Sequence, residues 1–403
     1  MKELSLVHDF KVPSHVSIQN WVLKCGSAGL SSLAERRTDW VFILDHMVEF
    51  GTQKCFLVLG MPLGEFRKNQ CQVKHADVRV IGVVVADKMN AAKVTAALTE
   101  FSKTSGVPVQ IVTDHGSDIK KGVEDFIAAS PIKPVYTYDI THKAAIILKW
   151  LLKDCPVWER FVRQCVEAKR LVLQTELGHL APPKPSDKAR WLNLDAYANW
   201  GQAVAAHMAE ARLDPERSAE AERLTKFFGW IDGFAPDLIR WGQVVKTLQA
   251  VKTEVKLNGL NRASAGRLTE RLAAFNGGAA DVATELCRFL DQESSALPDD
   301  EKWLGTSDII ESVFGKYKRF SQRATIKGIG KMVLTIPAFT GQMDMAKVGD
   351  AMESVKCVDV AQWIHNNLGT SLFAKRRKAI GAKLKSKCTV KFPVENFKKA
   401  ASF

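Results

Sequence analysis

The chain has 403 residues, of which 46% are hydrophobic and 25% are charged, and its formal net charge is +13. This composition is that of a folded protein long enough for two or three domains. The excess of positive charge favours a polyanionic partner such as nucleic acid or an anionic membrane surface, although a basic soluble enzyme would show the same balance. No run of about 18 uncharged apolar residues occurs, so we expect no membrane span.

Several kinds of site lack their sequence signature. The eight cysteines form no Cys-x-x-Cys pair and none has zinc-finger spacing to a histidine, which argues against a structural zinc site and a disulfide framework. No Walker loop, Gly-x-Ser-x-Gly or His-Glu-x-x-His motif is present, so we do not expect an ATPase, a serine hydrolase or a zinc protease. The first residues are not followed by the apolar segment of a signal peptide. We therefore expect free thiols in a reducing cytosol.

The N-terminal segment, residues 1–35, contains one clear helix signal. Residues 13–26 predict a helix that is capped by a serine near its start and ends at its glycine. Gln19 and Asn20 share a face of this helix, and their side chains are of the type that reads base edges. The segment is either a remnant of a helix-turn-helix DNA-binding region or a packing helix at a domain edge.

Residues 36–154 alternate strand and helix signals. The order is three strands, a helix, a strand, a helix, a strand and a helix. This order predicts an α/β fold of the ribonuclease-H-like type, with a mixed five-stranded sheet in which three antiparallel strands are extended by two strands added through helices. The predicted strands are 40–44, 55–59, 78–85, 107–113 and 134–140, and the predicted helices are 90–104, 117–129 and 142–152.

Strand signals vanish over residues 155–302, which predict a large all-α insertion domain. Its predicted helices are 158–175, 194–212, 216–234, 237–255 and 265–290. Residues 303–345 are expected to complete the ribonuclease-H-like domain with its final helix.

Residues 346–403 predict a helix and a basic tail. From Ser371 onward the chain has ten Lys or Arg residues and one acid, Glu395. Such a tail would neutralise DNA phosphates, and a solvated, partly disordered end is the alternative. The densest block is Lys375, Arg376, Arg377 and Lys378.

Three carboxylates stand where a two-metal site would need them. Asp45 follows the first predicted strand, Asp114 follows the fourth, and Glu311 lies in the final helix. In the expected sheet the first and fourth strands are neighbours, so the two aspartates would meet at one edge. Mg²⁺ prefers oxygen ligands, and two such ions clamp the attacking and leaving oxygens of a phosphodiester. Asp139 is a rival because it also ends a predicted strand, and Asp87 and Asp118 are lesser rivals.

Four segments around these acids resemble bacterial insertion-sequence transposases of the DDE class. The resemblance is to members with an α-helical insertion between the second Asp and the Glu, the hAT-like arrangement. It implies that Asp45, Asp114 and Glu311 bind two Mg²⁺ ions, for which Mn²⁺ can substitute, and that the enzyme cleaves transposon ends and joins them to target DNA. The segments are RTDWVFILDH (37–46), VTDHGSD (112–118), YDITHK (138–143) and SDIIESVFGKYK (307–318).

The resemblance also implies DNA contacts. Lys318 follows the catalytic glutamate by seven residues, where the family often has a phosphate-binding lysine, and Lys316 is expected nearby. His142 resembles a histidine that positions the scissile phosphate, although a capping or core histidine is an equal alternative. The chain departs from the family by having Leu304 and Ser307 where Tyr and Arg are usual, so cleavage through a hairpin stays an open question.

Two further groups are candidates for DNA contact. In the insertion, Lys188 and Arg190 precede Trp191, a combination that suits a DNA end with a base stacked on the indole. A buried tryptophan that anchors the insertion is the alternative. His115, beside the second acid, would donate to phosphate or simply begin the next helix.

The expected partners follow from the same resemblance. They are double-stranded DNA, as transposon ends and target, and further copies of the chain in a homodimer or larger assembly on DNA. No membrane partner is expected, and the location would be the bacterial cytoplasm, at the nucleoid. Two other functions stay open: a catalytically silent, domesticated transposase that binds DNA, and a ribonuclease-H-like nuclease acting on RNA–DNA hybrids or junctions.

Overall fold

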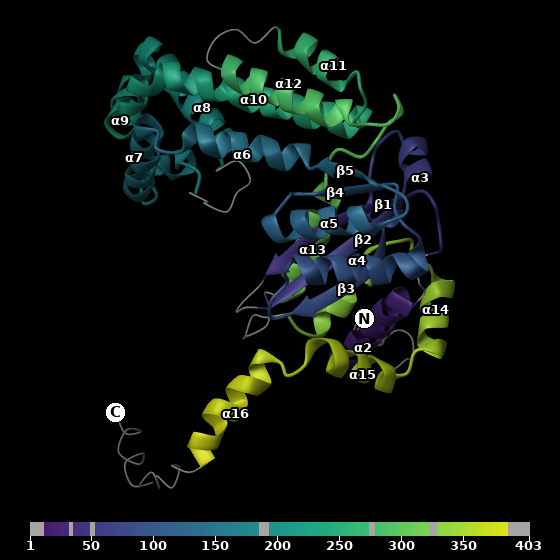
Figure 1. Cartoon of the computed structure of the whole chain (residues 1–403). Coiled ribbons are helices and arrows are strands. Elements are labelled where there is room, and N and C mark those ends of the chain that lie inside the picture. Colours follow the sequence, from purple (N-terminus) through teal and green to yellow (C-terminus); the bar gives the residue numbers. More distant parts are fainter. Residues whose placement is uncertain are drawn as a thin grey trace, which may run out of the picture.

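The computed structural model describes residues 12–31, 35–48, 53–184, 193–273, 279–321 and 329–385. The described chain is an α/β protein built around a five-stranded sheet (Figure 1). Helices α7 to α12 gather at one end of the molecule, and α2, α14 and α15 lie at the other. Among the described residues no helix combines the length and the apolar character needed to cross a bilayer.

The sheet has the strand order β3-β2-β1-β4-β5. β1 pairs antiparallel with β2, which pairs antiparallel with β3, while β4 and β5 extend the other side of β1 in parallel. This confirms the predicted mixed sheet, with the first strand beside the fourth. The strands are β1 (Trp40–Val48), β2 (Lys54–Pro62), β3 (Arg79–Ala86), β4 (Gln110–Thr113) and β5 (Val135–Tyr138).

The two faces of the sheet are covered by different helices. Alternate residues of a strand point to opposite faces, and in β1 Phe42 and Leu44 join the core beneath α4 (Ala91–Ser105) and α5 (Ser117–Ala129). Val41 and Ile43 join the other core, which includes α6 (Ile140–Leu152) and α13 (Asp308–Ser321). Asp45 follows Leu44 in β1, so its side chain points to the opposite face of the sheet, which is the face that α13 covers.

The region between α6 and α13 is helical, as predicted. An isolated β-bridge between Leu260 and Trp303 connects this helical region with the segment in which the chain returns to the sheet. Its apolar core is continuous with that of the sheet, through residues such as Ile140 and Val255. Its helices are α7 (Pro156–Val172), α8 (Leu194–Leu213), α9 (Ser218–Phe228), α10 (Ala235–Asn258), α11 (Ser264–Leu272) and α12 (Ala280–Ser295).

The single helix predicted over 265–290 is wrong, because the structure has two helices there, α11 and α12. The predicted stretch contains Asn276-Gly277-Gly278. Glycine is a poor helix former in an interior position, and this weakens a continuous helix.

The N-terminal helix α2 (His15–Ser31) packs against the C-terminal part of the chain. Ser14 caps it, since its hydroxyl accepts a hydrogen bond from the Ser17 amide at 3.1 Å. The prediction that Gly26 ends this helix is wrong. A Cβ at Gly26 would lie 1.5 Å from the carbonyl oxygen of Leu334, so this glycine lets two backbones approach closely inside the structure.

The remaining helices are α3 (Leu63–Lys68), α14 (Met345–Ser354), α15 (Cys357–Leu368) and α16 (Leu372–Lys385). Figure 1 shows α16 projecting away from the sheet and its covering helices. Short 3-10 helices occupy His75–Asp77, Glu176–Leu180, Pro215–Arg217, Gly229–Phe234, Lys331–Thr335 and Pro337–Phe339. The seven described cysteines carry free thiols.

Candidate active site

The strand register places Asp45 and Asp114 side by side. The parallel pairing of β1 with β4 runs to the pair Ile43 and Val112. Asp45 and Asp114 each lie two residues beyond that pair, on neighbouring strands that run in the same direction. Two carboxylates that are far apart in the chain are therefore neighbours at one edge of the sheet.

Asp45 lies inside β1 and not at its end. The strand continues to Val48 because its antiparallel pairing with β2 continues, and Asp45 itself is opposite Leu57. The predicted end at residue 44 is therefore wrong. The apolar run stops there, but the backbone hydrogen bonds to β2 do not.

The third acid approaches from the helix that crosses this face. α13 buries Ile310, Val313 and Tyr317 against the core and leaves Glu311 exposed. Asp45 is on the same face of the sheet, and the negative charges of both Asp114 and Glu311 act on it. The structure therefore gathers the three predicted acids in one region.

The environment of Asp45 disfavours its negative charge. Burial, followed by the nearby charge of Asp114, raises the pKa of Asp45 to about 7. Glu311 also raises this pKa, whereas the His46 amide, which donates to Asp45 Oδ1 at 2.6 Å, and the ammonium of Lys318 lower it. Like charges held together in this way are the arrangement that a bound cation stabilises.

Carboxylate oxygens of this kind fit Mg²⁺ or Mn²⁺, and Asp45, Asp114 and Glu311 are the residues that would hold such an ion. The described residues hold no cluster of three or more His, Cys, Asp or Glu side chains arranged about one metal position. Mg²⁺ usually takes one or two carboxylates and completes its shell with water and substrate phosphate. The donor chemistry of these acids would therefore suit such an ion, with water and a substrate phosphate supplying the other oxygen ligands.

The rival acid Asp139 has a structural role. It is fully buried, and its Oδ1 accepts hydrogen bonds from the amides of Thr141 and His142 at 2.8 and 3.0 Å. Its Oδ2 accepts from the amide and hydroxyl of Ser307 at 3.1 and 2.5 Å. Asp139 thus caps α6 and holds the start of α13. β5 ends at Tyr138, because the next residue, Asp139, is the N-cap of α6. The strand predicted to reach residue 140 is therefore too long.

Two histidines flank the acids as neutral rings. Burial, more than any other cause, lowers the pKa of both His46 and His115 to about 4. The Nε2 atoms of both are buried without a hydrogen-bond partner in the described structure. His115 has φ of 54° and stacks on Tyr138, with ring centroids 4.3 Å apart and an interplanar angle of 5°.

The lysines predicted in α13 lie on different sides of it. Lys318 is seven residues, or about two helical turns, after Glu311 on the same side of α13, and its charge lowers the pKa of Asp45. Lys316 faces His75, whose pKa it lowers after the larger effect of burial. Of these two lysines, Lys318 is therefore the one whose charge acts on the candidate site.

The other predicted DNA-binding residues are dispersed. His142 is half-buried, with its ring 6.3 Å from that of Tyr138. Gln19 donates a hydrogen bond to the sulfur of Met332 at 3.4 Å, and Asn20 is half-buried. Lys375, Arg376, Arg377 and Lys378 are exposed on α16, whereas Lys188, Arg190 and Trp191 lie outside the described residues.

The two positions at which the chain departs from the transposase pattern are structural. Leu304 is buried, and its amide and carbonyl pair with the side chain of Gln110 at 3.1 and 2.7 Å. Ser307 is bound to Asp139. Neither side chain is available to reach a substrate.

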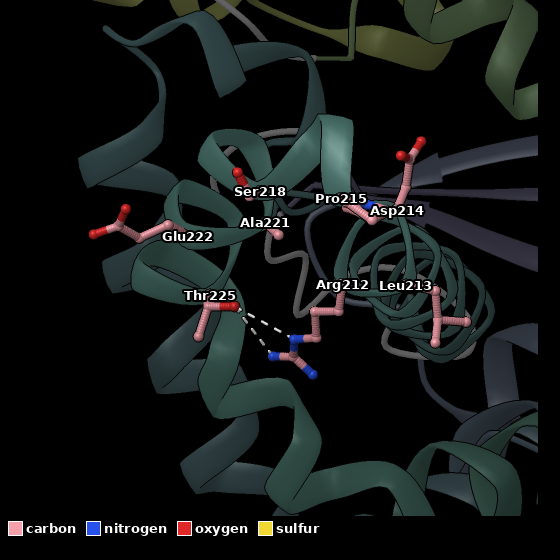
Figure 2. A pocket seen from close by; sticks show the side chains of 9 residues that line it. Arg212, Leu213, Asp214, Pro215, Ser218, Ala221, Glu222 and Thr225 are labelled. Atoms are coloured by element: carbon pink, nitrogen blue, oxygen red, sulfur yellow. Dashed lines mark hydrogen bonds between the residues drawn. The ribbon is translucent and has the colours of Figure 1, made fainter.

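A separate hollow of about 410 Å³ lies between α8 and α9 (Figure 2). Its basic group, Arg212, already donates to the hydroxyl of Thr225 at 3.3 and 3.4 Å and pairs with Asp232 at 2.9 Å. The hollow includes none of the three acids.

No protein-family model matches the chain. No curated protein matches it either.

Proposed function

We propose that this protein is a DNA transposase of the DDE class, with a ribonuclease-H-like catalytic domain interrupted by an all-α insertion. The observation that carries the proposal is the placement of Asp45 and Asp114 next to each other on neighbouring parallel strands, with Glu311 on the helix that packs against the same strand and its charge acting on Asp45. The strand order and the position of the helical region, between the second and third acids, support the same assignment.

In this proposal the three acids bind Mg²⁺, with Mn²⁺ as a substitute. When bound, two such ions activate a water or a 3′-hydroxyl and stabilise the leaving oxygen of a phosphodiester. The protein's own contribution is to hold the carboxylates at fixed positions on the sheet and on α13. Lys318 adds a positive charge at the same place, where it would contact a phosphate.

The proposed partner is double-stranded DNA, bound in an assembly of two or more copies of the chain. α16 supports the DNA partner, because its sequence LFAKRRKAIGAKLK has six basic residues and no acid, and Lys375 to Lys378 are exposed. A helix of this charge would bind phosphates without reading sequence. The proposed location is the bacterial nucleoid.

The proposal is tested by Mn²⁺ binding to the full chain, followed by cleavage of duplexes that carry the sequences flanking its gene. We expect the wild type to bind Mn²⁺ and to nick or cut these duplexes. Asp114→Asn and Glu311→Gln should bind DNA but lose cleavage. The matched control is Asp350→Asn, which changes an exposed aspartate of α14.

Retained cleavage in either site variant would refute the site. DNA binding without metal binding or cleavage by the wild type would instead indicate a catalytically silent DNA-binding protein. Cleavage of RNA–DNA hybrids in preference to duplex DNA would indicate a nuclease.

A further inference from the structure

Helix α12 of the helical region reaches the end of β5. Glu293 Oε2 accepts a hydrogen bond from the amide of Tyr138 at 2.9 Å. Phe289, one helical turn earlier, stands edge-on to the Tyr138 ring, with centroids 5.5 Å apart and an interplanar angle of 86°. α12 therefore holds both the backbone and the ring of Tyr138.

Tyr138 in turn packs against His115, the residue that follows the second acid, Asp114. Its ring is parallel to that of His115 at 4.3 Å, and Tyr136 lies 4.3 Å from the same imidazole. His115 has a left-handed backbone, which a side chain with a Cβ disfavours and which persists only where its surroundings enforce it.

The turn that contains His115 fixes the carboxylate of Asp114. The His115 amide donates to Thr113 Oγ1 at 3.1 Å, and the Gly116 amide donates to Asp114 Oδ1 at 2.9 Å. If the His115 ring moved, the backbone on both sides of it would turn, and the direction of the Asp114 carboxylate would change with it.

We propose that Glu293 and Phe289 of α12 act as positioning residues that orient Asp114, through Tyr138 and the His115 turn. This inference rests on the proposed function, because it assigns the purpose of the contact chain to a carboxylate that binds metal. It gives the helical region a second role beside any contact with DNA. Groups that orient a metal ligand typically change metal affinity or activity by about 10- to 100-fold when they are removed.

The test measures Mn²⁺ affinity of the full chain without DNA, by electron paramagnetic resonance, and the Mn²⁺ concentration for half-maximal cleavage separately from kcat. Glu293→Ala and Tyr138→Leu should each weaken Mn²⁺ binding by about 10-fold or more. Glu293→Gln keeps an oxygen acceptor for the Tyr138 amide and Tyr138→Phe keeps the ring, so both should restore the affinity. The control Asp291→Ala changes an exposed acid of the same helix.

The outcomes separate the two proposals. If the wild type binds Mn²⁺ through Asp114 but Glu293→Ala and Tyr138→Leu bind it equally well, the positioning role is refuted and the proposed function stands. If the wild type binds no Mn²⁺, or binds it as well as Asp114→Asn does, the proposed site fails and the inference fails with it.

A merely structural role would lower stability without changing Mn²⁺ affinity in the folded fraction. Urea unfolding of each variant therefore accompanies the measurement. Should Glu293→Ala fail to fold, Phe289→Leu, which keeps an apolar side chain but removes the aromatic edge, decides the question by the same readouts.

Discussion

Replacing Asp45 with Asn is expected to stabilise the folded chain at neutral pH, although it removes a candidate metal ligand. The pKa of Asp45 is raised from its ordinary value of 3.8 to about 7, chiefly by burial and secondly by Asp114. Between those two pH values the folded protein holds a proton that the unfolded chain has released. The free energy of unfolding of the wild type should therefore fall as the pH rises from about 4 to about 7, and stay low above it.

The size of the effect follows from the same values. At about 1.4 kcal/mol for each pH unit, the interval from 3.8 to about 7 sets an upper bound of about 4 kcal/mol. Asp45 keeps some contact with water and its charge is coupled to that of Asp114, so we expect about 2 kcal/mol. Asn retains an oxygen that accepts from the His46 amide, so this local hydrogen bond is preserved.

The assay is urea unfolding in the presence of a chelator, at several pH values from about 4 to about 8, with Asp350→Asn as the exposed control. Asp45→Asn and the wild type should have similar stability at about pH 4, and the variant should be more stable at about pH 8. Adding Mg²⁺ at the higher pH should stabilise the wild type and not the variant. A difference that does not change with pH, or a variant less stable than the wild type at about pH 8, would refute the reasoning.

Two other changes test separate parts of the structure. Asp139→Ala removes the acceptor of three backbone amides, those of Thr141, His142 and Ser307. In urea unfolding, this change should lower the free energy of unfolding by about 3 kcal/mol or more. A loss below about 1 kcal/mol would contradict the capping role. Replacing residues 375–378 with alanine should weaken DNA binding and reduce the slope of log affinity against log salt by about 3 to 4, measured by fluorescence anisotropy. The charge-matched control replaces four exposed lysines of α4 and α5, namely Lys93, Lys103, Lys120 and Lys121, and an equal change in slope there would show that α16 has no special part.

Much of the sheet could be predicted from the chain alone, because its signals are local. Apolar runs mark all five strands, and α5 begins and ends at the predicted residues, Ser117 and Ala129. The order of elements predicts which strands are neighbours, and from this the proximity of Asp45 and Asp114 follows. These features depend on periodicity and chain order, both of which are written in the sequence.

The tertiary structure decided what depends on partners distant in the chain. The extension of β1 to Val48 comes from its hydrogen bonds to β2. Gly26 is inside α2, at a point where Leu334 passes so close that a Cβ would not fit, so this glycine serves packing and does not end the helix. Asp139 resembled Asp45 and Asp114 by position, but the amides of residues beyond it and of Ser307 make it a cap. The contact of Glu293 with Tyr138 has no local signal at all, since a hydrogen bond between residues so far apart exists only once the helical region has folded against the sheet.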